Sequence, residues 1–345
     1  KLGQSSGPSS LGPKDFDLWR DVMKILAVDD DPIILELLGQ FVEIIGAHEL
    51  TTAPSALHAV DMLGDPDLGP IDCFMLDIQM PGMDGIELAQ HIRNSARHAD
   101  TPILMLTAMS DKRYIDAAFA AGATDYVTKP FEIAELKSRI GLVEGMVKER
   151  QQRTKKIFAA KTIADQATHM ELFEPVPIYD VDNVIDYTAM ENYVAQLSRS
   201  ALFGSTAFAF TIREVDAFHA TMTSFEFYSL VSDVAEILSD TLVDHQVLMS
   251  YAGNGTFVCV TESGWRPNMG GLMDAVNLEL SQTELFDNNG ERVHPRVSAG
   301  EAVRLIWKSG NSVMDALAQA HASAEAASEA HTKSLNDFWQ NDQQA

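Results

Sequence analysis

Cysteine and the basic residues are scarce in this chain of 345 residues. The only cysteines are Cys73 and Cys259, each inside an apolar run, so we expect no disulfide framework and predict a reducing, cytoplasmic location. Lysine and arginine total 25 against 50 acidic residues, for a formal net charge of −25. Nucleic-acid binders need a basic face to displace phosphate counterions, so this deficit argues against nucleic acid as a partner, and also against anionic lipid.

Long apolar runs are absent as well. No run approaches the roughly 20 residues of a membrane-spanning helix, and no signal peptide opens the chain, so we expect no membrane partner. Hydrophobic residues still make up 46% of the sequence, which is ordinary for a globular protein. The length exceeds the roughly 250–300 residues at which a single core stops growing, and it therefore predicts two domains.

Composition divides the chain into four parts. Residues 1–13 are rich in Gly, Ser and Pro, and we interpret them as a tag or flexible terminus. We predict a first acidic domain over residues 22–143 and a second acidic domain over residues 177–340. The basic stretch between them, residues 144–176, is predicted to be a long helical linker.

Short apolar runs alternate with amphipathic stretches in the first domain. Lys24–Val28, Cys73–Leu76 and Pro102–Leu106 have the length of buried strands, and helical patterns such as Pro32–Ile45 and Gly85–Ser95 lie between them. This alternation predicts an α/β fold with a doubly wound parallel sheet that helices cover on both faces. In such folds the functional groups gather at the carboxyl ends of the strands.

Chemically reactive side chains follow these predicted strands. Asp29 and Asp30 come after the first run, Asp77 after the third strand, Thr107 after the fourth and Lys129 after the fifth. Carboxylates that crowd together repel one another, so the cluster needs a cation, and hard oxygen ligands suit Mg²⁺. One carboxylate can then attack a phosphoryl group while the metal and a lysine neutralise its oxygens.

The motifs around these residues carry a family resemblance. VDDDP, MLDIQMPGMDG, LTA and YVTKPF, in this order and spacing, closely resemble a bacterial response-regulator receiver domain over about residues 22–143. The resemblance implies a flavodoxin-like, five-stranded domain in which Asp77 is the phosphoacceptor and Asp29 and Asp30 hold Mg²⁺. It also implies a partner histidine kinase, or another phosphodonor.

Further site residues are carried over from the same resemblance. The backbone carbonyl of Gln79 would be a metal ligand, Thr107 would hydrogen-bond the phosphoryl group and Lys129 would pair with it. Tyr126 matches the aromatic residue that changes rotamer on activation, and Pro130 matches a cis-peptide position. Of two other acids in these motifs, Asp31 is expected to be the N-cap of the helix that begins at Pro32, and Asp84 a loop or cap residue rather than a ligand.

The last helix of the first domain has no stop signal at its expected end. Leu136, Ile140, Val143 and Val147 follow a 4-3-4 spacing, which predicts a helix that leaves the domain and pairs with its twin in a homodimer on activation. The repeat is broken at Arg150, so a monomeric, solvated helix remains the alternative.

The second domain has an α+β pattern. Ala207–Val215 is a predicted strand, and Val247–Thr261 is predicted to form two strands around a Gly-Asn-Gly turn. The remaining expected elements are three helices and one strand: Tyr228–Val243, Leu272–Leu285, Val313–Ala330 and the strand Arg296–Val303.

This order resembles the diguanylate cyclase, or GGDEF, domain, which has a nucleotide cyclase-like fold. Tyr187–Tyr193 falls on that family's LTGLxNR, Glu214–Phe218 on its DxDxF and Tyr251–Phe257 on its RYGGDEF. The family's signature itself is degenerate here, because Gly255 and Thr256 stand where the two acids should be. The five residues of the degenerate signature are Gly253, Asn254, Gly255, Thr256 and Phe257.

Three functions are therefore open for the second domain. We expect it to be a non-enzymatic interaction module that binds a downstream protein partner. Alternatively, it binds a guanine nucleotide or cyclic di-GMP as a sensor, or it is an active cyclase with an unusual site. The missing acids argue against the last, because cyclising GTP requires acids that hold Mg²⁺ on its phosphates.

Overall fold

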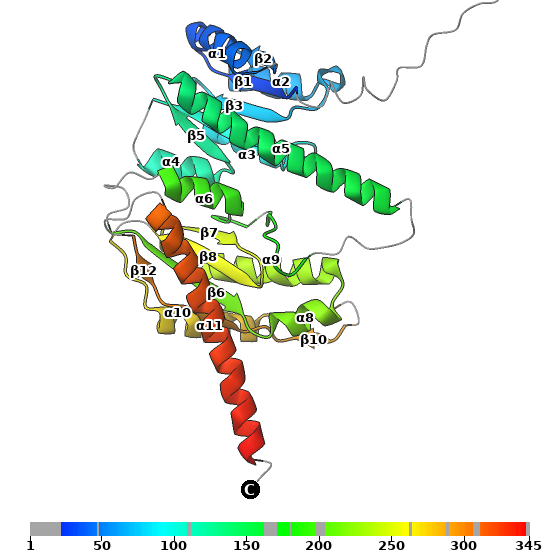
Figure 1. Cartoon of the computed structure of the whole chain (residues 1–345), viewed down its shortest axis with the longest axis vertical. Helices are drawn as coiled ribbons and strands as arrows, with labels where there is room; N and C mark the ends of the chain where they lie inside the picture. The colour runs from blue at the N-terminus through cyan, green and yellow to red at the C-terminus, as the bar shows by residue number, and fades with distance from the viewer. Residues whose placement is uncertain are drawn as a thin grey trace, which may run out of the picture. The chain divides into compact units, whose positions relative to one another are not determined.

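The computed structural model describes residues 22–46, 48–108, 112–161, 171–179, 181–196, 204–261, 264–287, 290–305 and 311–342. The chain divides into two compact units, residues 1–109 with 126–150 and residues 110–125 with 151–345 (Figure 1). None of the helices in the described part of the chain is long and apolar enough to span a membrane.

A five-stranded parallel sheet of order β2-β1-β3-β4-β5 organises the N-terminal part of the chain. The central strands are buried along nearly their whole length, as their apolar runs predict. Val28 pairs with Leu76 and Asp77 with Leu106, so the carboxyl ends of three neighbouring strands lie side by side. The strands are β1 Lys24–Val28, β2 Glu49–Ala53, β3 Cys73–Asp77, β4 Ile103–Thr107 and β5 Asp125–Thr128.

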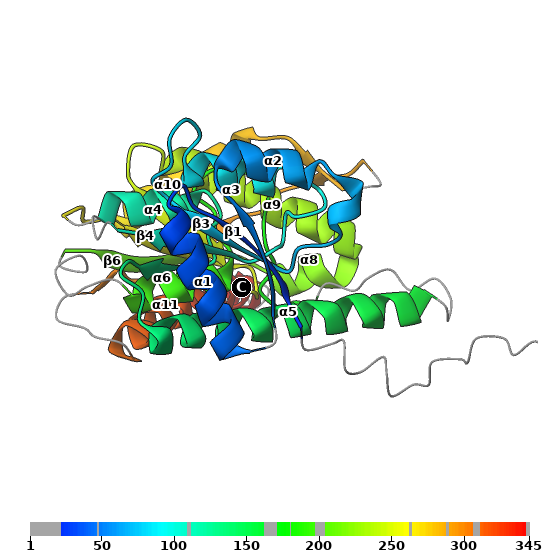
Figure 2. The ribbon, with the colours of Figure 1, turned by 90° about the horizontal axis from the view of Figure 1, so that it is seen from above.

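Helices cover both faces of this sheet. Seen from above, α1 and α5 lie on one side of β1 and β3, and α2 and α3 lie on the other (Figure 2). Asp31 and Asp84 cap α1 and α3 through their side chains, as expected. The helices of this unit are α1 Pro32–Ile45, α2 Ala56–Leu63, α3 Gly85–Arg93 and α5 Ile133–Lys161, with a short 3-10 turn at Pro66–Leu68.

Helix α5 runs without interruption from Ile133 to Lys161, well past the predicted end of the first domain. The apolar stripe predicted to pair with a second copy lies instead in the core of its own unit, where Leu136, Ile140, Val143 and Val147 are all buried. Spacing at a/d positions is common to a coiled coil and to a helix packed on a sheet. The prediction that these four residues form a dimer seam was therefore wrong.

The second unit contains an antiparallel sheet of order β11-β6-β8-β7, in which β12 also pairs with β6. The predicted hairpin is present, with Met249 of β7 opposite Cys259 of β8. The strands are β6 Thr206–Ile212, β7 Val247–Tyr251, β8 Thr256–Thr261, β11 Val297–Ala299 and β12 Val303–Arg304, and a separate pair is formed by β9 Leu285–Phe286 and β10 Arg292–Val293.

The single strand expected over Arg296–Val303 is two short strands, interrupted at Gly300. A Cβ atom on Gly300 would lie 2.6 Å from the backbone nitrogen of Ala324. The C-terminal helix therefore approaches this segment so closely that the strand breaks where only glycine fits.

Helices α9 and α10 contribute buried residues to the main core of the second unit, and α11 contacts β6, β8, β11 and α6. Helix α4 groups with this unit. There the hydroxyl of Tyr193 on α6 donates to Asp116 (2.8 Å) and accepts from Lys112 (2.9 Å), both on α4. The helices are α4 Lys112–Ala120, α6 Tyr187–Gln196, α8 Val215–Thr221, α9 Ser224–Thr241, α10 Met269–Gln282 and α11 Asn311–Asp342.

Candidate functional site

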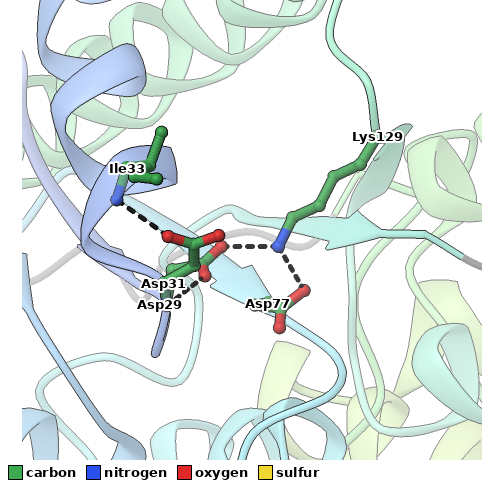
Figure 3. A network of polar contacts seen from close by, with 5 residues as sticks. All are labelled: Asp29, Asp31, Ile33, Asp77 and Lys129. Atoms are coloured by element: carbon green, nitrogen blue, oxygen red, sulfur yellow. Dashed lines mark hydrogen bonds and ion pairs between the residues drawn. The ribbon is translucent and has the colours of Figure 1, made fainter.

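A charged cluster lies at the carboxyl edge of the parallel sheet (Figure 3). Asp29 follows β1, Asp77 ends β3 and Lys129 follows β5. The Lys129 ammonium donates to Asp29 Oδ2 at 2.6 Å and to Asp77 Oδ1 at 2.8 Å. The remaining oxygen of Asp29, Oδ1, accepts from the backbone nitrogen of Asp31 (3.0 Å). One lysine thus joins two strand ends that are far apart in sequence.

The carboxylates of this cluster suit a divalent cation. One oxygen each from Asp29, Asp30 and Asp77 lies within 4.8 Å of the others. Asp29 is fully buried, Asp77 is 5% exposed and Asp30 is exposed to solvent. Three carboxylates facing one ammonium leave negative charge uncompensated in a partly buried site, and clustered carboxylate oxygens are ligands that Mg²⁺ accepts. The residues present therefore fit the metal that the sequence predicts.

Burial and neighbouring charge shift the acid–base behaviour of the cluster. Burial raises the pKa of Asp77, and the charges of Asp29 and Asp30 raise it further, against the lowering effect of Lys129. For Lys129, burial alone would lower the pKa, but the hydrogen bonds and charges of Asp29 and Asp77 outweigh it and raise the pKa. The lysine therefore stays protonated, and an added cation would favour the ionised, nucleophilic form of Asp77.

The other predicted site residues surround this cluster. Thr107 ends β4 and is buried, and its backbone carbonyl accepts from the backbone nitrogen of Lys129 at 2.7 Å. Tyr126 in β5 is also buried. Gln79 is exposed in the loop that follows β3. The Lys129–Pro130 peptide bond is cis, as the resemblance implies.

Gly85 is a structural residue of this site that the sequence analysis did not single out. Its backbone nitrogen donates to the carbonyl of Ile78 (3.0 Å), and a Cβ atom on it would lie 2.0 Å from the carbonyl oxygen of Asp77. Any side chain here would push on the backbone of Asp77. The Asp-Gly pair that ends MLDIQMPGMDG was the available signal, because Asp84 caps the helix that begins at Gly85.

The second candidate site, the hairpin between β7 and β8, is closed by the chain's own backbone. The backbone nitrogen of Asn254 donates to the carbonyl of Leu172 at 2.6 Å, and a Cβ atom on Gly253 would lie 2.5 Å from the carbonyl oxygen of Phe173. The Gly255 nitrogen donates to the hydroxyl of Tyr251 (3.1 Å). The backbone groups of the turn are thus engaged within the protein.

No carboxylate belongs to the hairpin itself. Thr256, at one of the two positions where acids were expected, is fully buried, and its hydroxyl lies 2.9 Å from that of Thr211. The side chain of Asn254 donates to Glu325 of α11 (2.5 Å). Glu214, the acid just before α8, is exposed, has a left-handed φ of 55° and makes no capping hydrogen bond. The described residues show no clustered acids here comparable to those at Asp77.

The family model and the relatives described here match about a third of the chain. A family model described as the response regulator receiver domain matches residues 25–141. The heme response regulator HssR of Staphylococcus haemolyticus is 42% identical over 125 residues, which are 35% of this chain and 51% of that protein. The DNA-binding dual master transcriptional regulator RpaA of Synechocystis sp. is 36% identical over 119 residues, 34% of this chain and 47% of that protein.

Two further proteins are similar over a comparable share of the chain. The cyclic di-GMP phosphodiesterase response regulator RpfG of Xanthomonas campestris pv. campestris is 33% identical over 142 residues, 40% of this chain and 36% of that protein. The solved chemotaxis response regulator CheY4 of Vibrio cholerae is 30% identical, with 35% of this chain and 98% of that chain covered and a TM-score of 0.33. The chain spans about half the length of the regulators HssR and RpaA. Residues 25–141 form the receiver domain of a two-component response regulator.

Proposed function

We propose that this protein is a phosphorylation-dependent response regulator in which Asp77 accepts a phosphoryl group from a histidine kinase or another phosphodonor. The observation that carries the proposal is the double contact of the Lys129 ammonium with Asp29 and Asp77. These contacts hold the Lys129 ammonium beside the carboxylate of Asp77, where the oxygens of a bound phosphoryl group would lie. The partner kinase follows from the receiver domain itself.

The transfer is an in-line displacement at phosphorus. An oxygen of Asp77 forms the new P–O bond while the bond from phosphorus to the donor nitrogen breaks, and the donor imidazole leaves as the neutral base after taking up a proton from solvent. Lys129 neutralises charge on the phosphoryl oxygens and the hydroxyl of Thr107 donates to one of them. Mg²⁺ bound by Asp29, Asp30, Asp77 and the Gln79 carbonyl would supply further positive charge to those oxygens.

Phosphorylation would then act as a packing switch. It adds negative charge at a position now satisfied by one lysine, so Thr107 would move toward the phosphoryl group and Tyr126 would follow. Both residues are buried, and close-packed interiors change between discrete arrangements rather than continuously. The switch would therefore alter the surface around β5.

For the second domain we propose a degenerate GGDEF-like fold that works as a protein-interaction module without cyclase activity. Two observations support this proposal. The turn Gly253–Gly255 has no carboxylate to hold Mg²⁺ on a nucleotide, and the backbone of Leu172 and Phe173 occupies the position against the turn. A guanine-nucleotide sensor is the second candidate, and it rests on the resemblance of the surrounding motifs.

The test has two arms on the full chain. Acetyl phosphate with Mg²⁺ is expected to produce a slower-migrating band on a phosphate-affinity gel, and that band should be absent for Asp77→Asn. Incubation with GTP, Mg²⁺ and beryllofluoride is expected to yield no cyclic dinucleotide. If Asp77→Asn gave a shifted band as strong as that of the unaltered chain, the phosphorylation of Asp77 would be disproved. Clear formation of a cyclic dinucleotide would disprove the absence of cyclase activity.

Two further measurements refine the output. Saturable micromolar binding of GTP or cyclic di-GMP would favour the sensor over the interaction module. Homodimerisation on activation is a separate prediction, and a doubled mass in light scattering on adding beryllofluoride is the result expected. A mass that stays monomeric would remove the homodimer from the proposal and leave phosphotransfer intact.

A further inference from the structure

A groove lies in the second unit between the first turns of α9 and the paired strands β9 and β10. It encloses a cavity of about 60 Å³. Its floor is apolar and includes Leu230, Met222, Leu285 and Val293, of which the last three are partly buried and pack against the main core. The β9–β10 pair belongs to neither large sheet, so this wall of the groove is a separate two-stranded element.

Two phenylalanines on the walls of the groove are exposed to solvent. Phe225 on α9 is 75% exposed and Phe286 on β9 is 59% exposed. Leaving a large aromatic side chain in water forgoes the free energy of burial, and single exposed apolar residues are common. Two that flank one apolar groove form a contiguous patch, and such patches mark interaction sites.

The polar lining of the same groove is acidic. Glu226, Asp233 and Asp287 all line it, and its described lining contains no lysine, arginine or histidine. Glu226 accepts from the Thr223 nitrogen (2.7 Å) and Asp287 from the Glu291 nitrogen (2.7 Å), so both carboxylates are fixed by the backbone.

Asp233 differs from these two acids. It is partly buried and has no hydrogen-bond or ion-pair partner among the described residues. Burial raises its pKa, and the charge of Glu236 raises it further. Arg292 on the neighbouring strand β10 donates to the carbonyl of Ser281 instead (3.5 Å). A half-buried carboxylate beside a second acid gains from an incoming cation more than a solvated one does.

We propose that this groove docks a basic, apolar peptide segment of a partner protein. An apolar side chain would enter between Phe225 and Phe286, and a lysine or arginine next to it would pair with Asp233. The charge of the chain, −25, favours such a partner and repels nucleic acid and anionic membranes. The inference rests on the proposed role of the second domain as an interaction module, and it names the chemistry of the partner.

The probe for the test is a short fluorescent amphipathic peptide made only of leucine and lysine. Its control replaces every lysine with glutamate. Fluorescence anisotropy with the full chain is expected to show saturable binding of the lysine peptide and none of the glutamate peptide. Phe225→Ser and Asp233→Asn are each expected to weaken binding by at least about tenfold, because central aromatic and buried charged contacts carry most interface energy.

Matched variants separate docking in the groove from general attraction to an acidic protein. Leu278→Ser removes another exposed apolar residue, 56% exposed on α10, and Asp240→Asn removes another carboxylate of α9. Both are expected to change binding by less than about twofold. Equal weakening by the control pair and the groove pair would overturn the proposal.

A second readout locates the peptide directly. With ¹³C-methyl methionine, the Met222 signal should shift on adding the lysine peptide, while that of Met249, a buried residue of β7, should not. A Met222 signal that stays in place under saturating peptide would also overturn the proposal. Phosphorylation of Asp77 is measured independently, so a failure of the groove and a failure of the switch give different results.

Discussion

Two sites at strand ends can be compared: the carboxyl edge of the parallel sheet and the β7–β8 hairpin. They differ in which groups occupy them. At the first, Asp29 and Asp77 are almost fully buried and share one lysine. At the second, backbone from Leu172 and Phe173 lies against the turn. Burying charge is costly and leaves a site that needs a ligand, whereas a turn closed by backbone hydrogen bonds needs none.

The difference between the two regions indicates where in the molecule activity is expected. A cluster of acids that repel one another is retained against stability, so it indicates chemistry. A turn whose backbone N–H groups are hydrogen-bonded within the protein indicates a structural role.

Removing the acceptor should have the largest effect. Asp77→Asn replaces the only proposed nucleophile with an amide, so phosphorylation by acetyl phosphate should be lost entirely. Asp61→Asn, at an exposed carboxylate of α2, is the matched control and should be labelled like the unaltered chain. Labelling should be followed on phosphate-affinity gels, and a shifted band in Asp77→Asn would place the acceptor elsewhere.

Restoring acids to the hairpin should not restore a metal site. In the double variant Gly255→Asp and Thr256→Glu, the first side chain meets Val215, whose Cγ2 lies 2.7 Å from the Cβ position, and the second buries a carboxylate. We expect no cyclic dinucleotide from GTP and a loss of about 4 kcal/mol in the free energy of unfolding.

Gly290→Asp provides the control for this loss. Gly290 has a φ of 77°, close to the 69° of Gly255, and nothing lies within 4 Å of its Cβ position. It should cost only about 1 kcal/mol, which is the strain of a left-handed residue alone. Cyclase activity in the double variant, or a loss no greater than that of Gly290→Asp, would show that the hairpin is open.

Removing the shared lysine should leave the acidic cluster unbalanced. Lys129→Met keeps the length of the side chain and removes its charge, so the carboxylates of Asp29 and Asp77 face each other. In EDTA the free energy of unfolding should fall by about 3 kcal/mol, and Mg²⁺ should recover part of the loss. Urea unfolding with and without Mg²⁺ measures both effects. An unchanged stability in EDTA would mean that the lysine does not hold the cluster together.

The first domain could be predicted in large part from its sequence. Apolar runs marked β1, β3 and β4 because these strands are buried on both faces, and the residues that follow them converge because parallel strands end at one edge. Strand β2, Glu49–Ala53, lies at the edge of the sheet and has the sequence ELTTA, so it lacks the apolar run that predicted β1, β3 and β4.

Contacts between distant segments were beyond the reach of local patterns. The stripe Leu136, Ile140, Val143 and Val147 was found, but its spacing does not reveal whether a sheet or a second helix covers it. The contact of Leu172 with Asn254 joins residues far apart in the chain, and nothing in either motif encodes it. The proposed docking groove likewise brings Glu226 and Asp233 of α9 near Asp287, which follows β9 and is far from them in sequence.

Gly85 tests how tightly the backbone is packed around the acceptor Asp77. Gly85→Ala would place a methyl group 2.0 Å from the Asp77 carbonyl oxygen, so the backbone of the acceptor must move. We expect a loss of about 2 kcal/mol in stability and a slower rate of phosphorylation. Gly141→Ala, where nothing lies within 4 Å, should stabilise α5 by about 1 kcal/mol and leave the rate unchanged. Equal rates for the two variants would contradict the positioning role.

The smallest effect concerns a buried polar group outside the charged cluster. His98 is 2% exposed, and neither ring nitrogen has a hydrogen-bond partner among the described residues. Burial lowers its pKa, and the charges of Arg97 and Arg150 lower it further. A neutral, unpartnered ring of this kind costs stability without offering a ligand site, which distinguishes it from the paired carboxylates.

The pH dependence of unfolding tests this reading of His98. Because its pKa in the folded protein lies below the ordinary value of about 6.5, the unfolded chain takes up the proton first. Protonation of His98 therefore does not disfavour the folded state above about pH 6.5, and the free energy of unfolding falls as the pH drops below that value. His98→Leu should raise the free energy of unfolding by about 1 kcal/mol at pH 7 and flatten the decline toward pH 5.5, as measured by urea midpoints. His58→Leu on the exposed face of α2 should leave the decline as it is. Parallel curves for the original chain and His98→Leu would mean that protonation of His98 does not cause the decline, and the acceptor Asp77 would not explain it either, because a raised pKa in the folded protein adds stability as the pH falls.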